Sequence, residues 1–160
     1  MTQAVLPVMR KRLSGVIVNI SSGAGRFGYP GGSAYVGTKF AIEGLSESLA
    51  YEVYLFGIRV VVVEPGFVQT NFSKAVMVAK RSQSPSSQYA AIMKKVASSF
   101  EQMLQNSSPP QLVAEIVLRA VTTKDPNLRY LAGKDVQQWV DQKQKMSDTA
   151  FFNMMRQSFQ

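Results

Sequence analysis

The chain has 160 residues, 46% of them hydrophobic, which is typical of one globular domain. It contains neither cysteine nor histidine, which argues against disulfides, thiol chemistry and a zinc site. The net charge is +8, but the basic residues are dispersed and form no basic and aromatic ladder, so we favour a solvated basic surface over a nucleic-acid site.

The first half of the chain predicts two buried strands joined by a helix. The end of a helix at 2–12 precedes a strand at 16–20, and a second strand follows at 59–64. Both strands are continuous runs rich in β-branched residues, which is typical of strands covered on both faces. Between them, apolar residues recur at helical spacing over about 33–56, and Gly57 stands at the C-cap position. This right-handed βαβ unit predicts an α/β fold, part of a doubly wound Rossmann-type parallel sheet.

The second half predicts helices, one more strand and an apolar tail. A serine-rich break at 82–88 precedes a helix at about 89–104, and a second helix begins at Pro109-Pro110. The last strand of the sheet falls within 126–133. The tail at 136–160 is expected to pack on the domain or on a second subunit, because it carries a large apolar surface: Trp139, Phe151, Phe152, Met154, Met155 and Phe159.

Tyr35 and Lys39 form the first candidate site. Residues four apart lie on one face of a helix, so both side chains can project into one cleft. A nearby ammonium group favours the phenolate form, which would make Tyr35 a better proton donor and acceptor. Ser22 follows the end of a parallel strand, where ligands commonly bind, and its hydroxyl could hold a substrate oxygen. An ordinary exposed helix pair is the alternative, because a bare Tyr-x-x-x-Lys is common.

Three segments, in their order and spacing, resemble the short-chain dehydrogenase/reductase family: 19–25 (NISSGAG), 30–41 (PGGSAYVGTKFA) and 64–70 (EPGFVQT). The resemblance implies that Tyr35 is the general acid/base at the substrate oxygen. It implies that Lys39 supports Tyr35 and contacts the nicotinamide ribose, and that Ser22 fixes the substrate. The expected cofactor is therefore NAD or NADP.

The segment 65–70 is similar to the family's loop for the nicotinamide carboxamide. The resemblance implies cofactor contacts from Pro65, Gly66, the backbone of Val68 and the hydroxyl of Thr70. The alternative is a plain strand-to-loop turn, since Pro-Gly occurs in many loops.

The resemblance covers nearly the whole chain but only the carboxyl-terminal half or so of a family member. No Gly-x-x-x-Gly-x-Gly lies upstream of Ser22, and the family's helix-borne asparagine should lie upstream of 2–9. The glycines of 23–28 follow the serine with the wrong spacing for a dinucleotide fingerprint, so we interpret them as a flexible substrate-side loop. We expect a single domain at 1–160 that is truncated at its N-terminus. The choice between NAD and NADP stays open, because the residue that decides it lies in the missing half.

These features predict an oxidoreductase that transfers hydride between NAD(P)(H) and a carbonyl or alcohol. The segment 71–108 resembles the family's substrate lid, and its apolar residues could form a pocket wall for an apolar substrate: Phe72, Met77, Tyr89, Ile92, Met93 and Phe100. For any one of these residues, simple helix packing is the favoured alternative. The alternative is an inactive fragment that acts, if at all, through self-association or protein binding. Family members commonly pair through the tyrosine-bearing helix, so we expect a homo-oligomer that uses 33–56, and strand 16–20 should have an open edge.

No apolar stretch reaches the ~20 residues that span a bilayer, so we expect no membrane span. The basic residues at 10–12 follow a weakly apolar stretch, whereas a secretory signal places them before it. The sequence therefore predicts a cytoplasmic protein.

Overall fold

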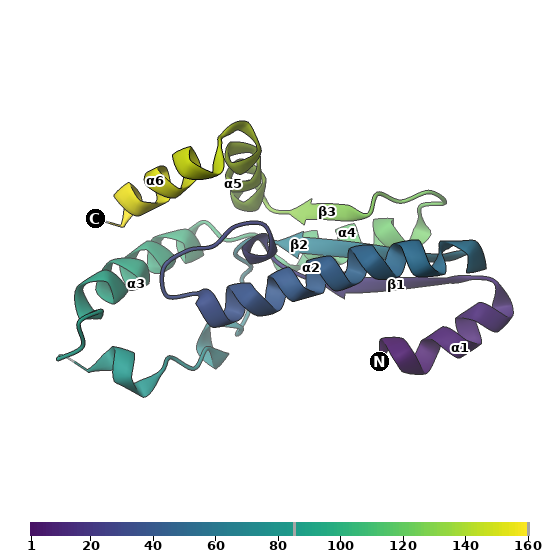
Figure 1. Ribbon diagram of the computed structural model, residues 1–160, viewed down its shortest axis with the longest axis horizontal. Helices are drawn as coiled ribbons and strands as arrows, with labels where there is room; N and C mark the ends of the chain where they lie inside the picture. The colour runs from purple at the N-terminus through teal and green to yellow at the C-terminus, as the bar shows by residue number, and fades with distance from the viewer. Residues whose placement is uncertain (85, 160) are drawn as a thin grey trace.

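The computed structural model describes residues 1–84 and 86–159, which build a three-stranded parallel sheet with helices around it (Figure 1). The strands are β1 (Gly15–Ile20), β2 (Ile58–Pro65) and β3 (Arg129–Ala132), in the order β1-β2-β3. Val18 pairs with Val61 across β1 and β2, and Val63 pairs with Tyr130 across β2 and β3. The predicted α/β class and parallel sheet are confirmed.

Helices cover both faces of this sheet (Figure 1). On one face, α1 (Thr2–Arg12) and α2 (Ser33–Val53) bury Leu6, Leu49 and Val53 against Ile17 of β1 and Ile58 and Val60 of β2. On the other face, α4 (Pro110–Thr122) packs Ile116 on Val63 and Ala132. This arrangement explains the unbroken β-branched run in β2, because side chains on both of its faces are buried.

The helix α2 ends close to the predicted position. Its α-helical part stops at Val53, and a 3-10 turn, η2 (Tyr54–Phe56), continues to Gly57. Gly57 has a φ of 64°, and a Cβ at this position would clash with the carbonyl oxygen of Leu13. Gly57 therefore ends the helix because it accepts a left-handed backbone beside the turn into β1.

The second half is mostly helical. After the 3-10 turns η3 (Ser73–Ala75) and η4 (Lys80–Gln83) come α3 (Ala90–Gln105) and, beyond β3, α5 (Lys134–Lys145) and α6 (Asp148–Ser158). The tail packs on this same chain, because Phe151, Met155 and Phe159 are buried in a cluster with Val96 of α3. Phe152 does not join the cluster and is 63% exposed.

The glycine-rich segment after Ser22 differs from its predicted form. Gly23, Ala24 and Gly25 make a buried 3-10 turn, η1 (Gly23–Gly25), so the expectation of a flexible loop is wrong for these residues. A Cβ on Gly23 would lie 2.7 Å from Val136 of α5, and one on Gly25 would lie 2.8 Å from the Oγ of Ser21. A Cβ on Gly25 would also lie 2.8 Å from the Cγ of Glu43 on α2, so the glycines allow η1 to pack closely against α2 and α5.

Within the described part of the chain, no helix combines the length and apolar character that a bilayer crossing requires.

Candidate functional site

Ser22 lies at the carboxyl end of the sheet, directly after β1. Its backbone is extended, with a φ of −171°. Its Oγ accepts a hydrogen bond from the backbone N–H of Ala24 at 3.2 Å and donates to the carbonyl oxygen of Pro65 at 3.4 Å. Ser22 thus caps η1 and joins the ends of β1 and β2, and its hydrogen bond to Pro65 is long.

Lys39 lies between the end of β1 and Tyr35. Its Nζ donates to the carbonyl oxygen of Ile20 at 3.1 Å and lies 5.5 Å from the centroid of the Tyr35 ring. Partial burial lowers the pKa of Lys39, and the nearby Glu43 carboxylate opposes that shift. The structure therefore brings Tyr35 and Lys39 together, through the face of the ring, as spacing on one helix predicts.

Ser22 reaches the same edge of the sheet by a different route. In the described part of the chain it makes no hydrogen bond to Tyr35 or Lys39, and its contacts are with Ala24 and Pro65. The three predicted residues thus share one end of the sheet, while only Tyr35 and Lys39 touch.

Aromatic side chains lie near Tyr35. Its ring centroid lies 6.0 Å from that of Phe72. Tyr29 is also near: burial of Tyr29 raises the pKa of its hydroxyl, and the proximity of Tyr35 raises it further. Tyr29 in turn packs on Phe100 at 5.4 Å, and Phe100 on Phe67 at 5.5 Å. The expected apolar wall is therefore present in part. Three of its predicted members are largely exposed to solvent: Phe72 at 60%, Met77 at 96% and Tyr89 at 69%.

The predicted cofactor loop 65–70 is held by hydrogen bonds on both sides. The N–H of Gly66 donates to Ala132 at 3.1 Å, and the N–H of Phe67 donates to the Asp135 carboxylate at 2.7 Å. The N–H of Gln69 donates to the carbonyl oxygen of Ser108 at 2.9 Å. These bonds fix the loop against β3, α5 and the segment before α4.

Within this loop, the backbone N–H of Val68 has no acceptor among the described residues. Its carbonyl oxygen accepts from the N–H of Thr70 at 2.8 Å, and the Thr70 hydroxyl accepts from Phe72 at 3.3 Å. This N–H is therefore a backbone donor that a ligand acceptor could use.

A cluster of buried charges lies beneath the site. Glu64, at the end of β2, is fully buried and pairs with Arg26 at 3.1 Å and with Arg129 of β3 at 3.6 Å. Arg129 also binds Glu43 at 2.9 Å and Glu47 at 2.5 Å, both on α2. Burial, with Glu43 nearby, raises the pKa of Glu64, and the Arg26 guanidinium only partly offsets this. The cluster ties the turn after Ser22, the helix of Tyr35 and the strand before Pro65 into one unit.

Neither Asp135 nor this charge cluster is among the residues that sequence patterns predict for the site. Asp135 is an acidic residue in the first turn of α5, a common place for one, so nothing near it in the sequence indicated its bond to Phe67. The charge cluster had no local signal.

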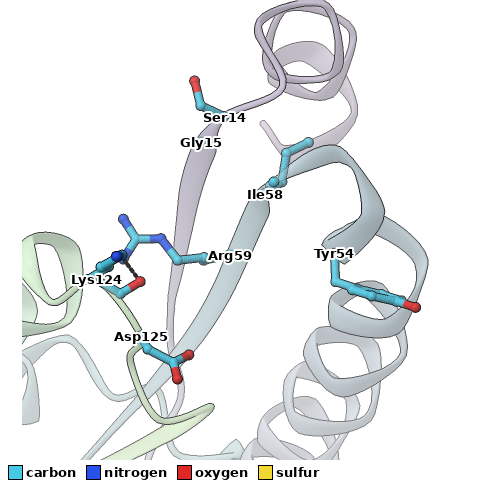
Figure 2. A pocket seen from close by; sticks show the side chains of 8 residues that line it. Ser14, Gly15, Tyr54, Ile58, Arg59, Lys124 and Asp125 are labelled. Atoms are coloured by element: carbon cyan, nitrogen blue, oxygen red, sulfur yellow. Dashed lines mark hydrogen bonds between the residues drawn. The ribbon is translucent and has the colours of Figure 1, made fainter.

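A pocket of about 500 Å³ lies at the opposite, amino-terminal end of β1 and β2 (Figure 2). The Arg59 side chain projects into it and donates to the carbonyl oxygens of Val121 at 3.2 Å, Lys124 at 3.4 Å and Thr123. Arg59 therefore satisfies the last carbonyls of α4, which is a structural role. The pocket is separate from the candidate site and is lined by Ser14, Gly15, Tyr54, Gly57, Ile58, Arg59, Lys124 and Asp125.

Comparison with known proteins agrees with the sequence resemblance. The family model for short chain dehydrogenases matches residues 1–81. An uncharacterised oxidoreductase of Schizosaccharomyces pombe is 35% identical over 149 residues, which make up 93% of this chain and 61% of the relative.

Solved structures agree as well. A short-chain dehydrogenase from Streptomyces avermitilis matches with a TM-score of 0.75 and 38% identity, over 90% of this chain and 51% of that one. The closed form of serine dehydrogenase complexed with NADP+ matches with a TM-score of 0.63 and 30% identity, over 82% of this chain and 48% of that one. This chain thus spans 61% of the yeast relative's length and about half of each solved structure. The chain belongs to the short-chain dehydrogenase family.

Proposed function

We propose that this chain is the catalytic part of an NAD- or NADP-dependent oxidoreductase acting on a carbonyl or alcohol. The observation that carries the proposal is the position of Lys39, whose ammonium group is bound to the end of β1 and lies over the Tyr35 ring. A cation fixed beside a phenol stabilises the negative charge that the phenol gains when it gives up its proton. Tyr35 is therefore suited to act as the general acid/base.

In this proposal Tyr35 gives its proton to the substrate oxygen during reduction and takes it back during oxidation. Ser22 exchanges its long hydrogen bond to Pro65 for one to the same substrate oxygen, which orients the reacting group. A bound nicotinamide cofactor supplies or accepts the hydride. The aromatic rings of Tyr29, Phe67 and Phe72 favour a substrate with an apolar body.

The residues of the 65–70 loop fit a nicotinamide carboxamide. The N–H of Val68, which has no acceptor in residues 1–84 and 86–159, is a donor for the amide oxygen, and the hydroxyl of the exposed Thr70 is a second polar group on the same loop. Pro65 and Gly66 set the turn that presents them. Lys39 would contact the ribose.

Binding of NADH or NADPH by the 160-residue chain tests the proposal directly. Trp139 is the only tryptophan, so energy transfer from it to NADH or NADPH reports binding without interference. Replacing Lys39 with alanine is expected to weaken binding about tenfold or more, because a charged hydrogen-bond donor is lost.

Lys95→Ala is the matched control, since Lys95 is an exposed lysine on α3, and its binding should equal that of the parent. If the folded parent chain bound neither nucleotide, this chain would not form the cofactor site by itself. Equal binding by Lys39→Ala and the parent would argue against the proposed role of Lys39.

A second candidate function is self-association through 33–56. Large apolar side chains are exposed along this helix: Phe40, Leu45, Tyr51, Tyr54 and Leu55, the last at 76%. The edge of β1 away from β2 pairs with no described strand, and Ile20 at its end is 46% exposed. Such surfaces favour a partner. We expect light scattering to give a mass above 17.6 kDa, and a monomer at high concentration would contradict this expectation.

A further inference from the structure

We propose that Asp135 is a positioning residue for the nicotinamide loop: its carboxylate holds the turn at Phe67 so that the N–H of Val68 faces the cofactor. This inference rests on the proposed function, because it assigns the element that shapes the carboxamide site. Asp135 lies in the first turn of α5, which begins directly after β3.

The contact between Asp135 and the loop is direct and charged. Its Oδ2 accepts the backbone N–H of Phe67 at 2.7 Å, a distance typical of a charge-assisted bond. Phe67 immediately precedes Val68, so this bond fixes the peptide plane next to the one that carries the free donor.

Two glycines make room for the carboxylate. A Cβ on Gly66 or on Gly133 would overlap the Asp135 side chain, so both positions require the absence of a side chain. Gly133 also has a φ of 135°, which other residues rarely adopt. Gly66 in the loop and Gly133 before α5 thus lie on either side of the Asp135 carboxylate, and its hydrogen bond to Phe67 depends on both glycines.

The remaining bonds of the loop leave one donor unused. Gly66 donates to Ala132, Phe67 to Asp135, and Gln69 to Ser108, which lies beside Val68 in a parallel bridge. Val68 alone among these neighbours has no acceptor within the described residues. Asp135 therefore directs the loop by occupying the N–H before Val68 while leaving that of Val68 itself free.

The test compares Asp135→Ala with Asp135→Asn, which keeps an acceptor oxygen at the same place. Asp141→Ala is the matched control, because Asp141 lies on the same helix and, among the residues that the structure describes, pairs only with Gln137 of that helix. Amide hydrogen exchange at Phe67 measures the hydrogen bond in the chain without cofactor. Calorimetry with NADH measures the cofactor site.

We expect Asp135→Ala to raise the exchange rate of the Phe67 amide and to weaken NADH binding about tenfold or more, since a hydrogen bond to a charged group is lost. Asp135→Asn should restore most of both, and Asp141→Ala should change neither. Thermal unfolding shows whether each variant is folded. If Asp135→Ala does not fold, the comparison of Asp135→Asn with the parent replaces it.

Unchanged exchange at Phe67 in Asp135→Ala would overturn the positioning bond itself. Faster exchange with undiminished NADH binding would overturn the link between Asp135 and the cofactor. Failure of the parent chain to bind NADH, with slow exchange at Phe67, would instead mean that this chain does not form the cofactor site by itself; it would overturn the role assigned to Asp135 in this chain and leave its bond to Phe67 in place.

Discussion

Replacing Tyr35 with phenylalanine is expected to lower turnover about 10²–10⁴-fold, the usual contribution of a positioned general acid/base. Phenylalanine keeps the ring that contacts Phe72 at 6.0 Å and lies beneath the Lys39 ammonium, so only the hydroxyl is lost. The fold should be unaffected. The effect should therefore appear in kcat and not in the melting temperature.

Because this chain spans about half the length of its solved relative from Streptomyces avermitilis, the measurement is best made in a chimera. The 160 residues replace the matching part of that protein, and oxidation of a panel of secondary alcohols is followed with NAD+ and NADP+. Tyr51→Phe is the control, since Tyr51 lies on the same helix and is 70% exposed. If the Tyr35→Phe chimera kept a kcat within about tenfold of the parent, the proton would have to come from another group.

The strands, the main helices and the pairing of Tyr35 with Lys39 could be predicted because each depends on residues close together in the chain. The run of β-branched residues in β2 and the apolar period of α2 are local patterns. The contact between Tyr35 and Lys39 follows from four-residue spacing alone.

The supports of the site could not be predicted in this way. The bond from Phe67 to Asp135 joins residues 68 positions apart, and that from Arg129 to Glu43 joins residues 86 apart. In the sequence, Glu43 is simply an acidic residue on a helix, and only the register of β2 with β3 brings Arg129 to it. The glycines after Ser22 were misjudged for the same reason, because Val136, which packs on Gly23, is distant in sequence.

The largest effect on stability is expected from Arg129→Met. This change removes the cation that pairs with Glu43 and lies 3.6 Å from the buried Glu64, and it leaves their carboxylates with too little positive charge nearby. Breaking a buried ion pair from one side costs about 3–5 kcal/mol. Arg129 is 26% exposed, so we expect the lower end of that range, about 3 kcal/mol near neutral pH. That is a large share of the ~5–15 kcal/mol that stabilises a typical domain.

The loss should depend on pH in a defined direction. The pKa of Glu64 is raised in the folded protein, so the folded state favours the protonated carboxyl group. The stability that Glu64 contributes is therefore complete below the unfolded pKa of about 4.3, and it is lost as the pH rises through the folded pKa. Without Arg129, ionised Glu43 and Glu64 repel more strongly. The difference in unfolding free energy between the parent and Arg129→Met should therefore be small near pH 4 and grow toward pH 7–8.

Urea denaturation across this pH range measures that difference, with Arg156→Met as the control because Arg156 is exposed and forms no ion pair within the described residues. Adding Glu43→Gln to Arg129→Met should recover part of the loss, since one of the stranded carboxylates disappears. If the loss stayed constant with pH, its cause would be the packing of the Arg129 stem. If Glu43→Gln restored all of the lost stability, Glu43 would be the main cause.

The same cluster joins the elements that carry Ser22, Tyr35 and Pro65. The Arg129→Met variant should therefore also bind NADH or NADPH less tightly at pH 7–8, where the carboxylates are ionised, than near pH 5.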